Sequence, residues 1–196
     1  HMRSHGAVCP DIPSIAQWLL RVLNAVGAQQ VTLVGHSMGS LIALEAAAQA
    51  PDRIQTLGMV GTAYPMRVSP VLLENSLNAP DKAIRMVNVF SHSTLAPPPS
   101  ALGPGTWLLG GSKALMRRVL ASNPHENIFN IGFKACDQYD QGEIAMAKVT
   151  CPTLFLLGQK DQMTTPKAAQ SLIRLAQNGQ VTMVNAGHQL MVEAPE

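Results

Sequence analysis

The sequence has little charge, few aromatic side chains and no long apolar run. Charged residues make up 13% of the 196 residues and the formal net charge is +2, too small a value to indicate nucleic acid as a partner. No apolar stretch approaches the ~20 residues that a membrane-spanning helix needs. No basic start followed by an apolar stretch indicates export. These absences favour a cytoplasmic protein without a membrane span.

The sequence is also poor in disulfide and metal-binding patterns. The three cysteines, Cys9, Cys136 and Cys151, are scattered and form no CxxC pair, which favours reduced thiols over a disulfide framework. The six histidines form no HxxxH or HExxH array. We therefore expect no structural or catalytic metal centre.

Hydrophobic residues, by contrast, make up 46% of the chain, enough to form the core of one domain. Short β-branched and apolar runs, typical of buried strands, alternate with helical patterns such as those over 11–27, 40–50 and 165–179. We expect four strands, at about 31–35, 53–63, 150–158 and 180–187. This alternation predicts an α/β fold with a mostly parallel sheet flanked by helices.

A long segment without a convincing strand pattern, residues 64–148, separates the second and third expected strands. It includes a proline- and glycine-rich loop at 96–105, and its helical patterns lie at about 80–91, 112–122 and 125–139. Ligands of open α/β sheets bind at the carboxyl ends of the strands. We therefore expect a core formed by 1–63 and 149–196, with 64–148 as an inserted helical lid over those ends.

The stretch GHSMG at 35–39 stands between the first strand pattern and a helical pattern. Ser37 is flanked by Gly35 and Gly39, which indicates a turn too tight for side chains on its neighbours. Such a turn strains the serine backbone and lifts the hydroxyl above the sheet. The N–H groups at the start of the following helix point to the same place. A serine here can also act merely as a helix cap, but the strand and helix on either side favour a nucleophile.

An acid and a histidine follow the last two expected strands. Asp161 comes directly after the third strand, in LGQKDQMTTP, and His188 comes directly after the fourth, in NAGHQLMVEAPE. A serine hydroxyl needs a base to take its proton, and the base needs an acid to orient it. The carboxyl ends of parallel strands share one edge, so we expect both side chains beside Ser37. Asp137 and Asp140, in the expected lid, are the alternative acids.

These features closely resemble the α/β-hydrolase family, in particular its serine esterases and lipases with a helical cap. The resemblance covers nearly the whole chain, because the segment 64–148 stands where the family carries its variable cap. The motifs that carry it are GHSMG at 35–39, LGQKDQMTTP at 157–166, GHQLMVEAP at 187–195 and, more weakly, RSHG at 3–6. The resemblance implies the α/β-hydrolase fold and a catalytic triad.

By this resemblance, Ser37 is the nucleophile, His188 is the general base and then the general acid, and Asp161 is the carboxylate that orients the imidazole. The backbone N–H of Met38 is one donor of the oxyanion hole. His36, next to the nucleophile, is expected to be a packing residue rather than a second base.

The expected lid carries many apolar side chains and no charged cluster that suits an anionic substrate. We expect Phe90 and Trp107 from the lid, and Met163 from the loop after the third strand, to bind the substrate. Such a pocket suits an apolar acyl or alkyl group. The expected substrate is therefore a small apolar ester or acyl compound.

In the family, further strands precede the elbow strand, whereas this chain has no strand pattern there. The resemblance implies that the chain is the central and C-terminal part of a larger hydrolase. The second oxyanion donor would come from the preceding part. The elbow strand would then leave an open sheet edge, through which we expect self-association or binding of a second chain.

The sequence therefore predicts a serine hydrolase that cleaves a carboxylic ester or a related acyl bond through an acyl-enzyme on Ser37. No metal or organic cofactor is needed for this chemistry. A thioesterase, a carbon–carbon bond hydrolase and a cofactor-free perhydrolase remain as alternatives that use the same residues. A non-catalytic ligand-binding protein of the same fold is the alternative from another class.

Overall fold

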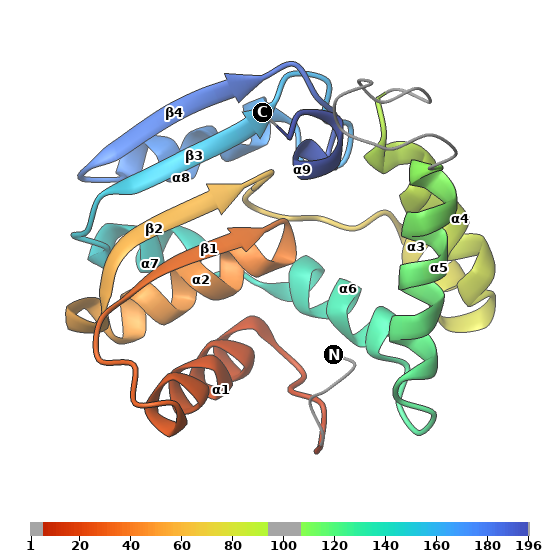
Figure 1. Ribbon diagram of the computed structural model, residues 1–196, viewed down its shortest axis with the longest axis horizontal. Helices are drawn as coiled ribbons and strands as arrows, with labels where there is room; N and C mark the ends of the chain where they lie inside the picture. The colour runs from red at the N-terminus through yellow and green to blue at the C-terminus, as the bar shows by residue number, and fades with distance from the viewer. Residues whose placement is uncertain (1–5, 94–106, 196) are drawn as a thin grey trace.

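A computed structural model describes residues 6–93 and 107–195 of the chain (Figure 1). The expected loop at 96–105 and the first three residues of the RSHG motif lie outside the described residues. The sheet has four parallel strands in the order β1-β2-β3-β4. Their bounds are Val31–His36, Ile54–Val60, Thr153–Gly158 and Gly179–Val184. The predicted α/β fold with a parallel sheet is confirmed.

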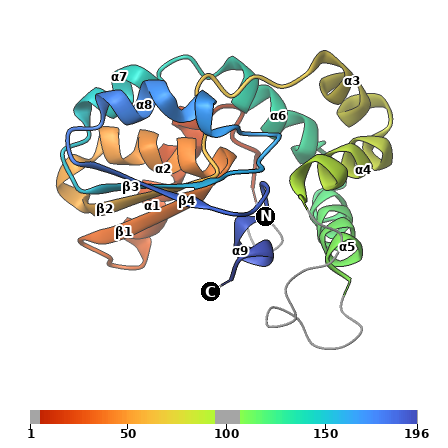
Figure 2. The same ribbon diagram turned by 90° about the horizontal axis from the view of Figure 1, so that it is seen from above.

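Helices cover one face of this sheet (Figure 2). The covering helices are α2 (Met38–Gln49), α7 (Gly142–Lys148) and α8 (Gln170–Leu175), and α1 (Ile12–Ala25) packs against α2. The short helix α9 (Leu190–Glu193) lies on the opposite side of the sheet. The first helix begins where the sequence predicts, because the side chain of Asp11 accepts a hydrogen bond from the N–H of Ser14 at 2.7 Å.

The main core lies between the sheet and α2, α7 and α8. Leu57 of β2 and Phe155 of β3 are fully buried there, and Met146 of α7 belongs to the same apolar cluster. Because side chains alternate along a strand, Leu57 and Phe155 point to the helix-covered face, where they meet α7. Helix α7 falls within the segment 64–148, and its apolar side chains contribute to this core. The division into core and lid remains a prediction.

Four more helices gather beyond the carboxyl ends of the strands (Figure 1). They are α3 (Pro70–Asn78), α4 (Pro80–Ser91), α5 (Leu108–Ala121) and α6 (Ile128–Gln138). The last three correspond to helical patterns in the sequence, whereas α3 and α7 were not expected. The helix expected over 165–179 is shorter: it follows a 3-10 turn and ends at Leu175, and Gly179 begins β4 instead of ending the helix.

The strand β1 pairs with β2 alone among the described residues, so it forms one edge of the sheet. Its Val34 is 69% exposed. The neighbouring Leu33 packs against the main core, so the alternation of side chains along a strand puts Val34 on the face opposite the helices. Within residues 6–93 and 107–195, no helix is both long and apolar enough to cross a membrane.

Candidate active site

Ser37 occupies a sharp turn between β1 and α2. Its backbone angles are φ 53° and ψ −123°, and it is the one non-glycine residue with positive φ among the described residues. Positive φ is unfavourable for a residue with a side chain, so the surrounding structure must hold it there. The N–H of Ser37 donates to the carbonyl of Val60 at the end of β2, at 2.9 Å. This bond fixes the turn to the neighbouring strand.

The two glycines of the turn differ in what they allow. A Cβ on Gly35 would overlap the backbone carbonyl of Gly39, so the close approach of strand and helix requires a glycine at 35. A Cβ on Gly39 would meet no atom within 4 Å among the described residues. The expectation that the turn excludes side chains therefore applies to Gly35, and Gly39 matters through its backbone.

Ser40, in the first turn of α2, stabilises the backbone of Ser37. It is fully buried, and its hydroxyl donates to the carbonyl of Ser37 at 2.6 Å. The same hydroxyl lies 2.7 Å from the buried hydroxyl of Thr62, which follows β2. Buried polar groups that are paired in this way define one backbone geometry. The backbone of the candidate nucleophile is thus fixed by the end of β2, by the segment after β2 and by α2.

The structure brings Asp161 and His188 together, as expected. Asp161 Oδ2 lies 2.9 Å from His188 Nδ1, and both residues are 4% exposed. The other carboxylate oxygen, Oδ1, accepts hydrogen bonds from the backbone N–H groups of Met163 and Thr164, both at 2.8 Å. The carboxylate is therefore fixed by the loop that follows β3.

Thr164 is a member of this group that the sequence reasoning missed. Its hydroxyl lies 2.7 Å from Asp161 Oδ2 and 2.9 Å from His188 Nδ1, and it is within 2.8 Å of the carbonyl of Gly61. A threonine three residues after an aspartate is typical of a turn closed by the carboxylate. That spacing was the available signal, and it indicates the turn but not the contact with the histidine.

Burial alone would raise the pKa of Asp161, but its hydrogen bond from His188 and the nearby imidazole act against this. The N–H and hydroxyl of Thr164 also donate to the carboxylate. The net effect holds the pKa of Asp161 below its ordinary value. Asp161 is thus a carboxylate that can orient an imidazole and stabilise its positive form.

His36 lies against the candidate base rather than merely filling the core. Its Nε2 donates to the backbone carbonyl of His188 at 2.7 Å, and the two rings are 4.6 Å apart. Burial lowers the pKa of His36, and the neighbouring His188 lowers it further. A neutral His36 with its proton on Nε2 fits this hydrogen bond. No sequence signal distinguished this role from packing.

His188 makes no hydrogen bond to Ser37 in the described part of the chain. The hydrogen bonds of its ring there are those of Nδ1 with Asp161 and Thr164. In enzymes without bound substrate, catalytic hydrogen bonds are often long and tighten only when substrate binds. The pairing of Ser37 with His188 therefore belongs to the functional proposal below.

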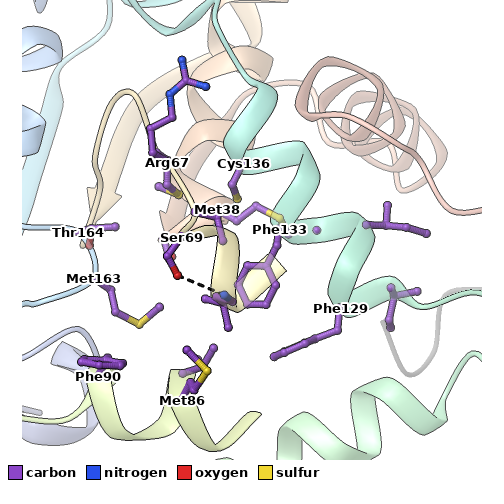
Figure 3. A pocket seen from close by; sticks show the side chains of 18 of the residues that line it. Met38, Arg67, Ser69, Met86, Phe90, Phe129, Phe133, Cys136, Met163 and Thr164 are labelled. Carbon is purple, nitrogen blue, oxygen red and sulfur yellow. Dashed lines mark hydrogen bonds between the residues drawn. The ribbon is translucent and has the colours of Figure 1, made fainter. Parts of the chain in front are cut away.

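A cavity of about 530 Å³ opens at Ser37, between the sheet and the helices α4 and α6 (Figure 3). Of the residues expected at the substrate, Phe90 and Met163 line it, and so does Met38. Trp107 does not line it: its side chain is 66% exposed. The structure brings the other expected residues together and leaves Trp107 outside.

The cavity wall is rich in sulfur and aromatic groups. They come from α2, α4, α6 and the loops after β2 and β3: Met38, Met66, Met86, Phe90, Phe129, Phe133, Cys136 and Met163. Arg67 is the cationic side chain of the described lining, and its guanidinium donates to the carbonyl of Asp137 at 2.6 Å and points away from the centre of the cavity (Figure 3).

Burial raises the pKa of Cys136 to about 12, so its thiol stays protonated. Across 6–93 and 107–195, no group of three or more side chains is placed to hold a metal ion.

The sequence is similar to known hydrolases. Residues 2–97 match the family profile described as alpha/beta hydrolase fold. Human monoglyceride lipase is 31% identical over 176 residues, which are 85% of this chain and 54% of that protein. Lipase 3 of Moraxella sp. strain TA144 is 27% identical over 187 residues, which are 90% of this chain and 56% of that protein. The chain spans a little over half the length of these relatives.

The fold is also found among solved structures. The esterase EaEST from Exiguobacterium antarcticum superposes with a TM-score of 0.81 at 18% identity, over 98% of this chain and 72% of that chain. The enol-lactonase from Burkholderia xenovorans LB400 gives a TM-score of 0.77 at 16% identity, over 98% and 72% of the two chains. At these identities the likeness shows the fold. The family match, the related sequences and the shared fold together make this chain a member of the α/β-hydrolase fold family.

Proposed function

We propose that this protein is a serine hydrolase that cleaves a carboxylic ester or a related acyl bond, with Ser37 as nucleophile. One arrangement carries the proposal. Ser37, on its strained turn, lines a cavity of about 530 Å³ and lies at the same sheet edge as the hydrogen-bonded pair Asp161 and His188. The likeness to lipases and an esterase supports hydrolysis as the type of reaction.

In the proposed reaction, the hydroxyl of Ser37 attacks the substrate carbonyl while His188 takes its proton through Nε2. Asp161, already bonded to Nδ1, stabilises the imidazolium that forms. The backbone N–H of Met38 opens α2 and has no partner within the helix, so it can donate to the developing oxyanion. His188 then protonates the leaving alcohol, and water releases the acyl group from Ser37 by the reverse sequence of proton transfers.

The cavity supports an apolar acyl group as the occupant. Its wall is made mainly of thioether and aromatic side chains, and the one cation of its described part, Arg67, is engaged with a backbone carbonyl. Methionine side chains adapt to ligands of different shape. We therefore propose apolar acyl esters as the substrate class.

The test is labelling by a fluorophosphonate probe together with hydrolysis of p-nitrophenyl esters. Ser37→Ala should retain the melting temperature, because the turn needs only a small residue there, and should lose both labelling and ester turnover, the latter by a factor on the order of 10⁴. Unlabelled wild-type protein would instead indicate a ligand-binding member of the family, and unchanged turnover in Ser37→Ala would exclude the serine mechanism.

A further inference from the structure

Among the described residues, the mechanism leaves one buried carboxylate without a role. Glu193, the last residue of α9, is 5% exposed. It forms no ion pair with a cation in the described part of the chain, where the ion pairs are Arg117–Asp81 and His188–Asp161. A carboxylate is costly to bury unless hydrogen bonds replace its hydration. The groups that donate hydrogen bonds to the Glu193 carboxylate therefore identify the segments that this side chain holds together.

Three donors from two separate segments meet on this carboxylate. The N–H of Gly187 donates to Oε2 at 2.7 Å. The N–H of Ser93 donates to Oε1 at 2.6 Å, and the hydroxyl of Ser93 donates to Oε2. Gly187 directly precedes His188, and Ser93 follows the end of α4. Glu193 thus links the histidine loop to a helix that lies 100 residues away in the sequence.

A second contact joins the same two segments on the other side of the histidine. The N–H of Gln189 donates to the carbonyl of Ser91 at 3.0 Å. The fit is close, because a Cβ on Gly187 would lie 2.8 Å from the nitrogen of Ser93. The backbone on both sides of His188 is therefore anchored to residues 91–93, once directly and once through Glu193.

The anchoring segment also reaches the acid loop and the cavity. The hydroxyl of Ser91 donates to the sulfur of Met163 at 3.0 Å, two residues after Asp161. Met86 and Phe90 of α4, about two turns and less than one turn before Ser93, line the cavity. One helix thus carries part of the substrate wall and the anchor of the histidine loop.

We propose that Glu193 is a positioning residue for His188, which it holds at the angle needed to reach Ser37 by tying Gly187 to Ser93 at the end of α4. The inference rests on the proposed function for its kinetic consequence, whereas its structural part concerns the histidine loop alone. It assigns α4 a role in both substrate binding and the orientation of the base.

Glu193→Gln is the most direct test of the carboxylate, because it keeps the shape of the side chain and removes the charge. The two carboxylate oxygens accept hydrogen bonds from the backbone N–H groups of Ser93 and Gly187, one each. The amide of glutamine has one acceptor oxygen, so in either orientation its NH2 group faces one of these N–H donors and that hydrogen bond is lost. The matched control is Glu143→Gln, on the exposed first turn of α7. The variants are compared by amide hydrogen exchange at Gly187, by the NMR signal of the His188 Nδ1 proton, and by kcat and KM for p-nitrophenyl butyrate.

In Glu193→Gln we expect the amide of Gly187 to exchange at least about tenfold faster, and the Nδ1 proton signal to broaden or move. We expect kcat to fall by about ten- to a hundredfold, the effect of one hydrogen bond to a charged group, with KM within about threefold of the wild type. Glu143→Gln should match the wild type in every measurement. Ser93→Ala, which removes one donor to the same carboxylate, should give a smaller change in the same direction, and it carries the test if Glu193→Gln does not fold.

A merely structural role predicts a different result. In that case the folded fraction falls, while kcat per folded molecule and the Nδ1 signal stay unchanged, and this outcome would overturn the proposal. Unchanged exchange at Gly187 would overturn it as well. A wild-type chain that hydrolyses no ester would contradict the proposed function, and the exchange and NMR measurements would still decide the role of Glu193.

Discussion

Asp161 shows how a single buried side chain is kept ionised. Burial opposes its charge, but four donors surround the two oxygens: the ring of His188, the N–H and hydroxyl of Thr164, and the N–H of Met163. The pKa of Asp161 is lowered as a result. The folded state therefore binds the proton less tightly than the unfolded state, so the ionised carboxylate stabilises the fold at pH values above its unfolded pKa.

This lowered pKa predicts a pH-dependent difference between the wild type and Asp161→Asn. The wild type should be the more stable protein near neutral pH, and its advantage should shrink as the pH falls below about 4 and through the folded-state pKa. Urea denaturation between neutral pH and about pH 3 measures the difference in the free energy of unfolding. Asp140→Asn, at an exposed position, is the control and should give a nearly constant difference. A constant difference for Asp161→Asn as well would mean that the carboxylate is not stabilised in its ionised form.

At the scale of elements, the turn between β1 and α2 depends on two glycines for different reasons. Gly35→Ala should lower the melting temperature by roughly 6–12 °C, because its Cβ would overlap the carbonyl of Gly39. Gly39→Ala should raise it by roughly 1–4 °C, because position 39 lies within α2, has space for a methyl group, and alanine favours a helix over glycine. Thermal denaturation of the two variants measures both shifts. Equal losses in the two variants would mean that the turn excludes side chains at both positions.

Helix α4 presents one side to the cavity and the other to solvent. Phe90 lines the cavity, whereas its neighbour Val89 is 67% exposed and does not. Phe90→Ala should therefore change the preference among ester chain lengths more than it changes hydrolysis of the shortest ester. Val89→Ala and Trp107→Ala are the controls and should leave the preference unchanged. Measurements of kcat/KM on p-nitrophenyl esters of increasing length test this, and equal losses at all lengths would show that Phe90 only supports the fold.

Most regular elements near the active site could be predicted from sequence, because their signals are local. The four strands follow from apolar runs, and α1 follows from the helical pattern over 11–27, where the side chain of Asp11 caps the helix. Helix α3 was missed because its apolar pattern is short and interrupted by polar residues. The extent of α8 was overestimated because its sequence continues to favour helix past Leu175, whereas the pairing of Gly179 with Thr153 of β3 requires extended backbone. Pairing between distant segments thus overrode the local preference.

The same distinction applies to the candidate site. The sequence predicts Ser37, Asp161 and His188 at strand ends, and the carboxyl ends of parallel strands share one edge of the sheet. The supporting contacts of Thr164, His36 and Glu193 depend on side-chain direction and on loops that meet only in the fold. Trp107 was expected in the cavity because it is an apolar residue of the expected lid, but the direction of a side chain cannot be predicted from composition.

At the scale of the whole molecule, the described sheet is covered unequally. Helices α2, α7 and α8 bury one face, while α9 reaches only part of the other (Figure 2). On that second face Val34 of β1 is 69% exposed and Leu154 of β3 is 39% exposed. Strand β1 also lacks a partner on its outer side among the described residues. An apolar face next to an unpaired strand edge favours association with another chain.

This arrangement predicts that the 196-residue chain associates in solution at β1. Sedimentation velocity over a range of concentrations should show species heavier than the 20.9 kDa chain, with the heavier fraction growing as the concentration rises. Val34→Lys should reduce that fraction, because it places a charge beside the open edge, and charged side chains are a common means of blocking edge-to-edge pairing. Since Val34 is exposed, the substitution should change the free energy of unfolding by no more than about 0.5 kcal/mol. Val26→Lys, at a residue 70% exposed after the end of α1, adds the same charge away from the edge and should leave association unchanged. A wild-type chain that remains monomeric at all concentrations, or equal effects of the two lysines, would show that the edge of β1 does not drive association.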